Sequence, residues 1–194
     1  MIETTRLLDD TAQQALHALL GKTFTAYEAY IMFEGPDQVF KTLRLEFGDK
    51  RYLLSNEHMS IPLGPDASLE EVSVLSMLPD DGRELWYPSN KQIMRKVGVD
   101  LRIDDIYLVV DTIELTKGDI PVNKLKLTQA VVFREGARLL AIDRDIWFDE
   151  YLTIREGMDL DILIRDAKGD WSEEPPFGYK FTRDVISLAL GVRV

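Results

Sequence analysis

The 194-residue chain contains no cysteine, and this absence excludes several kinds of site at once. Without a thiol there are no disulfide bonds, no thiolate-bound zinc ions and no cysteine nucleophiles, so we expect packing alone to stabilise the fold. Histidine is also scarce, because His17 and His58 are the only two. A metal centre with three or more histidine ligands is therefore excluded.

Long apolar runs and common catalytic fingerprints are missing as well. No segment approaches the roughly 18 consecutive apolar residues of a membrane-spanning helix. The sequence has no G-x-G-x-x-G or G-x-S-x-G motif, which argues against dinucleotide binding and against a serine hydrolase. The first residues contain no basic segment followed by an apolar one, so we expect no secretory signal and a cytoplasmic location.

Positive charge is in short supply. The chain has 23 Lys and Arg against 34 Asp and Glu, which gives a formal net charge of −11, and the excess acid is spread over both halves. A surface of this sign repels phosphate groups, so we expect neither nucleic acid nor a membrane surface as a partner. The small basic group of Lys91, Arg95 and Lys96 is expected to be a solvated helix face.

What the chain does contain is typical of a globular protein that folds as one domain over residues 1–194. Hydrophobic residues make up 45% and charged residues 29% of the sequence. Four segments rich in Gly, Asp and Pro separate pairs of apolar stretches, as tight turns do in β-hairpins. These expected turns are 48–50, 79–82, 134–137 and 156–159.

Between those turns, apolar and polar residues alternate as they do in half-buried strands. One such strand is expected over residues 39–47. One side of it carries Val39, Leu43, Leu45 and Phe47, and the other carries Phe40, Thr42, Arg44 and Glu46. We therefore expect a β-rich body over about 23–165. Residues 69–78 are expected to form a strand, although a capping box at their start and their helical spacing favour a short helix as the alternative.

Helices are expected near both ends of the chain. Apolar spacing predicts one over about 9–20, ended by Gly21, and another over about 182–190, ended by Gly191. A further helix is expected over 90–97, and residues 169–179 are expected to form a surface loop. The predicted fold class is α+β, with a large and mainly antiparallel β-sheet, or a partly closed β-barrel, and short helices near both termini.

A row of carboxylates is the first candidate site. In an extended strand Asp143, Asp145, Trp147 and Asp149 project to the same side. Three acids in one row are able to bind a hard cation or to act as an acid and base pair, but the expected arrangement is a solvated strand face. The pair Asp159 and Asp161 is a weaker instance of the same pattern.

Aromatic residues form the second candidate. Tryptophan and tyrosine are enriched at interface hot spots because one rigid ring buries a large area at little entropy cost. The candidate binding residues are Trp86, Tyr87, Trp147, Trp171 and Phe177.

From these observations we expect a non-catalytic binding module that recognises a protein partner, with a basic partner favoured by the acidic surface. Self-association with a second copy is a further expectation. One alternative is a carrier of a hydrophobic small ligand, held in the cavity of a closed sheet. Another is an enzyme, carboxylate-based or metal-dependent, acting at the Asp143, Asp145 and Asp149 row. No cofactor and no resident metal are expected.

Overall fold

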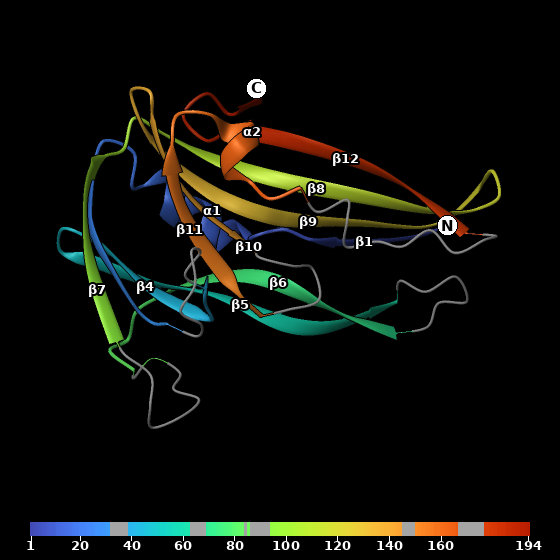
Figure 1. Ribbon diagram of the computed structural model, residues 1–194, viewed down its shortest axis with the longest axis horizontal. Helices are drawn as coiled ribbons and strands as arrows, with labels where there is room; N and C mark the ends of the chain where they lie inside the picture. The colour runs from blue at the N-terminus through green and yellow to red at the C-terminus, as the bar shows by residue number, and fades with distance from the viewer. Residues whose placement is uncertain (32–38, 63–68, 84, 86–93, 145–149, 167–176) are drawn as a thin grey trace.

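The computed structural model describes residues 1–31, 39–62, 69–83, 85, 94–144, 150–166 and 177–194. In these residues the chain forms thirteen strands and two short helices, and the strands make two layered sheets (Figure 1). This arrangement confirms the prediction of a large, mainly antiparallel sheet, although the strands divide between two sheets. The alternative of a sheet that partly closes on itself is not what the described strands form.

The larger sheet has eight strands in the order β13-β12-β8-β9-β10-β11-β3, and β1 pairs in parallel with the first half of β9. The other pairings in this sheet are antiparallel. Its strands are β1 (Ile2–Arg6), β3 (Val39–Phe40), β8 (Asp105–Lys117), β9 (Ile120–Glu135), β10 (Arg138–Arg144), β11 (Leu152–Gly157), β12 (Phe177–Ser187) and β13 (Val192–Arg193).

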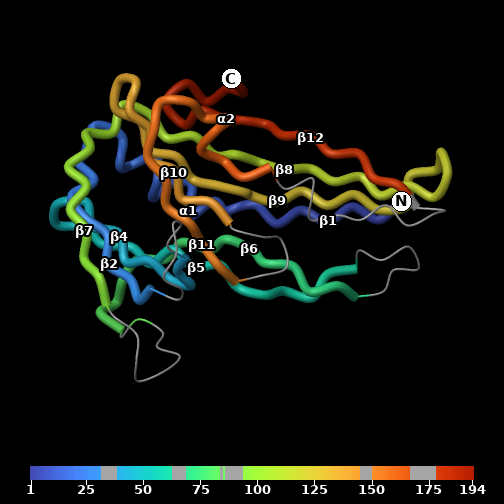
Figure 2. The backbone as a smooth tube through the Cα atoms, viewed as in Figure 1, coloured from blue at the N-terminus to red at the C-terminus, as the bar shows by residue number. Residues whose placement is uncertain are grey.

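The smaller sheet has five antiparallel strands in the order β6-β5-β4-β2-β7. The long hairpin of β5 and β6 passes below the strands β8, β9 and β12 of the larger sheet (Figure 2). The strands of the smaller sheet are β2 (Thr23–Tyr30), β4 (Thr42–Phe47), β5 (Lys50–Pro62), β6 (Leu69–Pro79) and β7 (Met94–Arg102).

Two predicted hairpins are confirmed by their turns. Gly48 joins β4 to β5 with φ of +65°, and Gly136 joins β9 to β10 with φ of +56°. Side chains other than glycine rarely adopt these left-handed values, which is why the turns fall at these positions. The alternation predicted for residues 39–47 is present from Thr42 onward, because Leu43, Leu45 and Phe47 are buried in β4. Val39 and Phe40 do not belong to that strand; they form β3 and pair with β11 in the larger sheet.

The main hydrophobic core lies between the two sheets. Phe24 and Phe47 of the smaller sheet contact Phe133 of the larger one, with ring centroids 5.0 and 5.6 Å from the Phe133 ring. Tilted rings at these distances add to the stabilisation that comes from burying their area. Two smaller clusters surround this core, one between β5, β6 and the far end of β8 and β9, and one beneath the second helix.

The N-terminal helix is present as predicted, although it is shorter. The helix α1 (Asp10–His17) begins after Asp9, whose carboxylate accepts a hydrogen bond from the Ala12 amide at 2.7 Å. Leu16 is fully buried against the main core. Gly21, with φ of +75°, follows the last turn.

The C-terminal helix predicted over 182–190 is wrong. Thr182 to Ser187 belong to β12, which pairs with β8 over its whole length, and residues 188–191 form a turn. Val185 packs on the cluster beneath the second helix, whereas its neighbour Ile186 packs on the core between the sheets. A strand that is partly buried on both faces has adjacent apolar residues, which imitate helical spacing.

The predicted loop over 169–179 is also corrected at its end. Phe177, Gly178 and Tyr179 are the first residues of β12 and pair with Lys117 to Leu115. The preceding part of this loop, up to residue 176, lies outside the described residues.

The helix predicted over 90–97 is wrong in its described part. Met94 to Val97 are extended in β7 and pair with Tyr30 to Tyr27 of β2. The partner strand supplies backbone hydrogen bonds that outweigh the local helix signal. Residues 90–93 lie outside the described part of the chain.

The hairpin predicted around 156–159 has only one strand. After β11 the chain forms the helix α2 (Leu160–Leu163), where a second strand was expected. Asp159 is the N-cap of this helix, because its carboxylate accepts a hydrogen bond from the Asp161 amide at 3.0 Å. The pair Asp159 and Asp161 therefore marks a helix start and no strand face.

The strand predicted over 69–78 is confirmed as β6, which pairs with β5. Of the second strand expected after the turn at 79–82, Leu85 is described; it is buried and lies outside any strand. Residues 86 and 87, the rest of that expected strand, are outside the described residues.

Candidate functional site

Asp143 is the only member of the predicted carboxylate row that the structure describes, and it is fully buried in β10. Arg155 of β11 places Nη1 3.1 Å from both of its carboxylate oxygens, and the Arg165 amide donates a hydrogen bond at 3.0 Å. The Thr153 hydroxyl donates a further one. The expectation of a solvated strand face is therefore wrong for Asp143, which ties β11 and the segment after α2 to β10. Asp145 and Asp149 lie outside the described residues.

A second buried ion pair lies beside the first. Asp111 of β8 faces Arg183 of β12, with Nε 2.7 Å from one carboxylate oxygen and Nη2 2.8 Å from the other. Burial raises the pKa of Asp111, although the hydrogen bond and charge of Arg183 act in the opposite direction. Arg183 also donates to the backbone oxygen of Arg165 at 2.9 Å, so both ion pairs hold the same segment.

A third buried charge lies between the two sheets. Arg144 is fully buried at the end of β10, and its Nη1 donates to the backbone oxygen of Ser73 at 2.5 Å. Its Nη2 donates to the side chain of Gln129 at 2.9 Å. This contact joins β10 of the larger sheet to β6, the edge strand of the smaller sheet. These three groups of buried charge all make contacts that hold strands together.

A serine, a histidine and an aspartate also lie near one another, but in the wrong order for nucleophilic catalysis. Ser187 and His17 line the same groove, and the Ser187 hydroxyl donates to Asp105 at 2.6 Å. It accepts a hydrogen bond from the Leu190 amide at 3.1 Å. A nucleophilic serine gives its proton to the histidine, whereas this one holds the end of β12 in place.

That groove lies between α1 and the turn from β12 to β13, and its volume is about 450 Å³. One wall consists of Asp10, Gln13, Gln14 and His17, which share one face of the helix at spacings of three and four residues. The opposite face of the helix packs on the core. We call this feature the α1 groove; its second wall is formed by Ile186, Ser187, Leu188 and Gly191.

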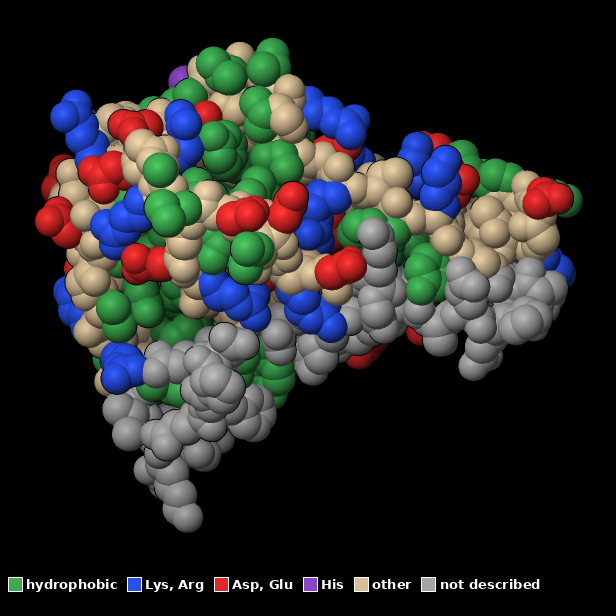
Figure 3. All heavy atoms as spheres, turned by 45° about the horizontal axis from the view of Figure 1, so that its top comes forward, with side chains coloured by type: hydrophobic (Ala, Val, Ile, Leu, Met, Phe, Trp, Pro, Cys, Tyr) green, Lys and Arg blue, Asp and Glu red, His purple; other side chains and the backbone are tan. Residues whose placement is uncertain are grey.

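Exposed apolar side chains continue from the second wall. Leu190 is 66% exposed, and Val192 and Val194 are also exposed in the last residues of the chain. Figure 3 shows hydrophobic side chains grouped on the upper part of this face, in the region where Figure 1 places the C-terminus. Apolar side chains bordered by polar ones are typical of surfaces that bind other proteins.

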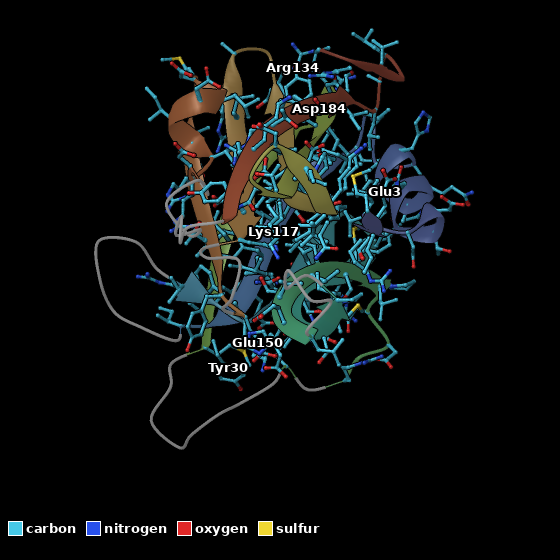
Figure 4. All side chains as sticks on the ribbon, turned by 90° about the vertical axis from the view of Figure 1, so that its right-hand side faces the viewer. Glu3, Tyr30, Lys117, Arg134, Glu150 and Asp184 are labelled. Atoms are coloured by element: carbon cyan, nitrogen blue, oxygen red, sulfur yellow. The ribbon has the colours of Figure 1, made fainter. Side chains whose placement is uncertain are left out.

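The α1 groove and the buried ion pairs of Asp143 and Asp111 lie on different sides of the molecule. In Figure 4 the two helices flank the sheets on opposite sides, with α1 at the groove and α2 next to the segment that the ion pairs hold. The groove is therefore separate from every carboxylate of the predicted row that the structure describes.

The predicted aromatic sites are largely outside the described residues. This holds for Trp86, Tyr87, Trp147 and Trp171, whereas the backbone of Phe177 begins β12. Of the small basic group, Lys91 is also outside, and Arg95 and Lys96 are exposed on β7. Lys96 forms an ion pair with Glu46 at 2.6 Å, so these bases belong to a strand and not to a helix face.

Across the described part of the chain, no three His, Asp or Glu side chains gather closely enough to hold a metal ion. No helix among these residues has the length and apolar character needed to cross a membrane. Comparison of the chain with protein-family models, with curated proteins and with solved structures gives no significant match.

Proposed function

We propose that this protein is a non-catalytic binding module that recognises a protein partner through the α1 groove. The observation that supports the proposal best is the groove itself, where polar side chains of α1 face the apolar Ile186 and Leu188 across about 450 Å³. Such a mixture suits a peptide segment, because its backbone needs hydrogen-bond partners while one or two of its side chains need an apolar surface.

The charge of the groove favours a basic partner. Asp10 is the only charged carboxylate among the described lining residues, and no Lys or Arg is among them. The chain as a whole carries −11, which attracts a basic partner at long range and repels nucleic acid. We therefore propose a partner segment that presents an apolar residue next to Lys or Arg.

The two alternatives receive less support from the described residues. An enzyme built on the carboxylate row needs Asp143 to reach a substrate, but this side chain is fully buried and bound by Arg155 and Thr153. A carrier needs space between the sheets, where Phe24, Phe47 and Phe133 contact one another.

Site-specific photo-crosslinking tests the proposal. A photoreactive residue replaces Leu190 at the rim of the groove in one variant and Ile162 of α2 in a matched control. Ile162 is 79% exposed and belongs to α2, the helix that Figure 4 shows on the other side of the sheets from α1. We expect one dominant protein adduct at position 190. An excess of wild-type protein should abolish this adduct, because the wild-type protein and the photoreactive variant compete for the same partner.

Two results would count against the proposal. The first is equal labelling at positions 190 and 162, because a non-specific surface gives that pattern. The second is an adduct at position 190 with twice the mass of the chain, because it identifies a second copy and no foreign partner. A cytoplasmic location is part of the same proposal, and cell fractionation tests it.

A further inference from the structure

A second, smaller cavity lies on the outer face of the five-stranded sheet and takes no part in the proposed function. Its volume is about 250 Å³, and β4, β5, β6 and the segment after β6 line it. Leu53, Ser55 and Glu57 alternate along β5 and project away from the core, into which Tyr52 and Leu54 point. The remaining walls are formed chiefly by Leu78, Arg83 and Leu85.

The segment after β6 is held over this face by a network of charges. Arg44 donates from Nε to Asp80 at 2.8 Å and from Nη2 to the backbone oxygen of Arg83 at 2.7 Å. Glu28 accepts a further hydrogen bond from Arg44 at 2.7 Å. As a result Leu85 covers the outer face of the sheet and, like Leu53, is almost completely buried. The cavity is therefore part of an anchored structure.

Opposite charges line this cavity. The guanidinium of Arg83 is oriented by Asp81, with Nε 2.8 Å and Nη2 2.9 Å from its carboxylate oxygens. Glu57 accepts a hydrogen bond from the Ser55 hydroxyl at 3.0 Å. Leu53 and Leu78, which are paired residues of neighbouring strands, add an apolar part to a lining that is otherwise mostly polar.

We infer that this cavity binds a free aliphatic α-amino acid or a zwitterion of the same size. Its carboxylate would bind Arg83, its ammonium group would bind Glu57, and its side chain would contact the leucines. A zwitterion suits the site because its net charge is zero, whereas a simple anion would be repelled by the neighbouring acids Asp80, Asp81 and Glu57. The volume corresponds to about eight water molecules, which is the size of a molecule such as leucine.

The test is an amide NMR titration of the full chain with L-leucine. We expect saturable shifts for the amides of residues 53–57 and 78–83, with a Kd of about 1 mM. L-leucinamide lacks the carboxylate and 4-methylpentanoate lacks the ammonium group. Each should bind about tenfold more weakly than leucine, because one charged contact is lost.

Variants test the two charged residues directly. Arg83→Gln and Glu57→Gln should each weaken leucine binding about tenfold, while shifts elsewhere in the spectrum report that the fold is intact. Arg193→Gln and Glu71→Gln remove the same charges at other positions and should change the Kd by less than about twofold. Absence of saturable shifts with leucine overturns the inference, and so does leucinamide binding as tightly as leucine. Neither outcome bears on the α1 groove, which lies on another surface.

Discussion

Replacing Asp143 by Asn should destabilise the protein strongly, because this carboxylate is the fully buried partner of Arg155. The substitution keeps the shape of the side chain but removes its charge. It also replaces one acceptor oxygen by an NH2 group, which is a donor and would face either the Thr153 hydroxyl or the Arg165 amide, both of which are donors. Breaking a buried ion pair by removing one partner costs about 3–5 kcal/mol. Because the Arg155 side chain is 23% exposed and keeps some water, we expect a loss of about 3 kcal/mol.

Urea denaturation, followed by circular dichroism, measures this loss. With a slope of about 2 kcal/mol per molar urea, the unfolding midpoint should fall by about 1.5 M. Asp161→Asn is the matched control, because Asp161 is an exposed carboxylate on the nearby α2, and it should change stability by less than about 0.5 kcal/mol.

A double-mutant cycle separates the ion pair from other effects. The Asp143→Leu and Arg155→Met changes together should cost less than the sum of the two single changes, with a coupling energy of about 1–3 kcal/mol. If Asp143→Asn were as stable as the Asp161→Asn control, the structural role assigned to Asp143 would be wrong.

Three further outcomes are expected. Arg144→Met should lower the free energy of unfolding by about 2–4 kcal/mol, measured by urea denaturation, because it leaves buried acceptors without a donor. The hydrogen bond from Arg83 lowers the pKa of Asp81 to about 2, so carbon-detected NMR should show it titrating near that pH. The stability that the ionised Asp81 carboxylate contributes should be present above pH 3.8 and should be lost as the pH falls through about 2. Burial raises the pKa of Asp111, so the folded state binds the Asp111 proton more tightly than the unfolded state does. The stability that this protonation contributes is present below pH 3.8 and decreases as the pH rises above that value. In urea denaturation at a series of pH values, the Asp111→Asn variant should lack this decrease in the free energy of unfolding.

The sequence predicts those parts of the fold whose local signals agree with their surroundings. The alternation in residues 42–47 and the turn glycines Gly48 and Gly136 predict hairpins that the structure contains. The prediction fails in β12, where both faces are partly buried. Val185 and Ile186 contact different clusters on opposite sides of the sheet, and their adjacency imitates a helix.

The helix α2 shows that an available signal was misread. Asp159 precedes Leu160, Leu163 and Ile164, whose spacing is typical of a helix. Gly157, two residues before Asp159, was instead interpreted as the turn of a hairpin. The packing of these residues over the outer face of the larger sheet favours a helix over a second hairpin strand, and this packing cannot be seen in the local sequence.

The α1 groove could not be predicted from the sequence, because its two walls are more than 160 residues apart. Gln14 and Gly191 meet only because α1 packs beside the end of β12, and neither belongs to a motif. The sequence contains one local feature that relates to the groove: the helical spacing of the residues that form its first wall, Asp10, Gln13, Gln14 and His17. Asp143 was found by its position in a row, but its burial depends on Arg155, Arg165 and α2.

The most direct test of the proposed function is the dissociation constant of the partner recovered by crosslinking at position 190. It is measured with purified proteins for the wild type, for Leu190→Lys and for Ile162→Lys. We predict that Leu190→Lys weakens binding about tenfold or more, because a charge at the rim repels a basic segment and removes apolar contact, while Ile162→Lys changes it by less than about twofold. Equal effects of the two substitutions, or a larger effect at position 162, would contradict binding through the α1 groove.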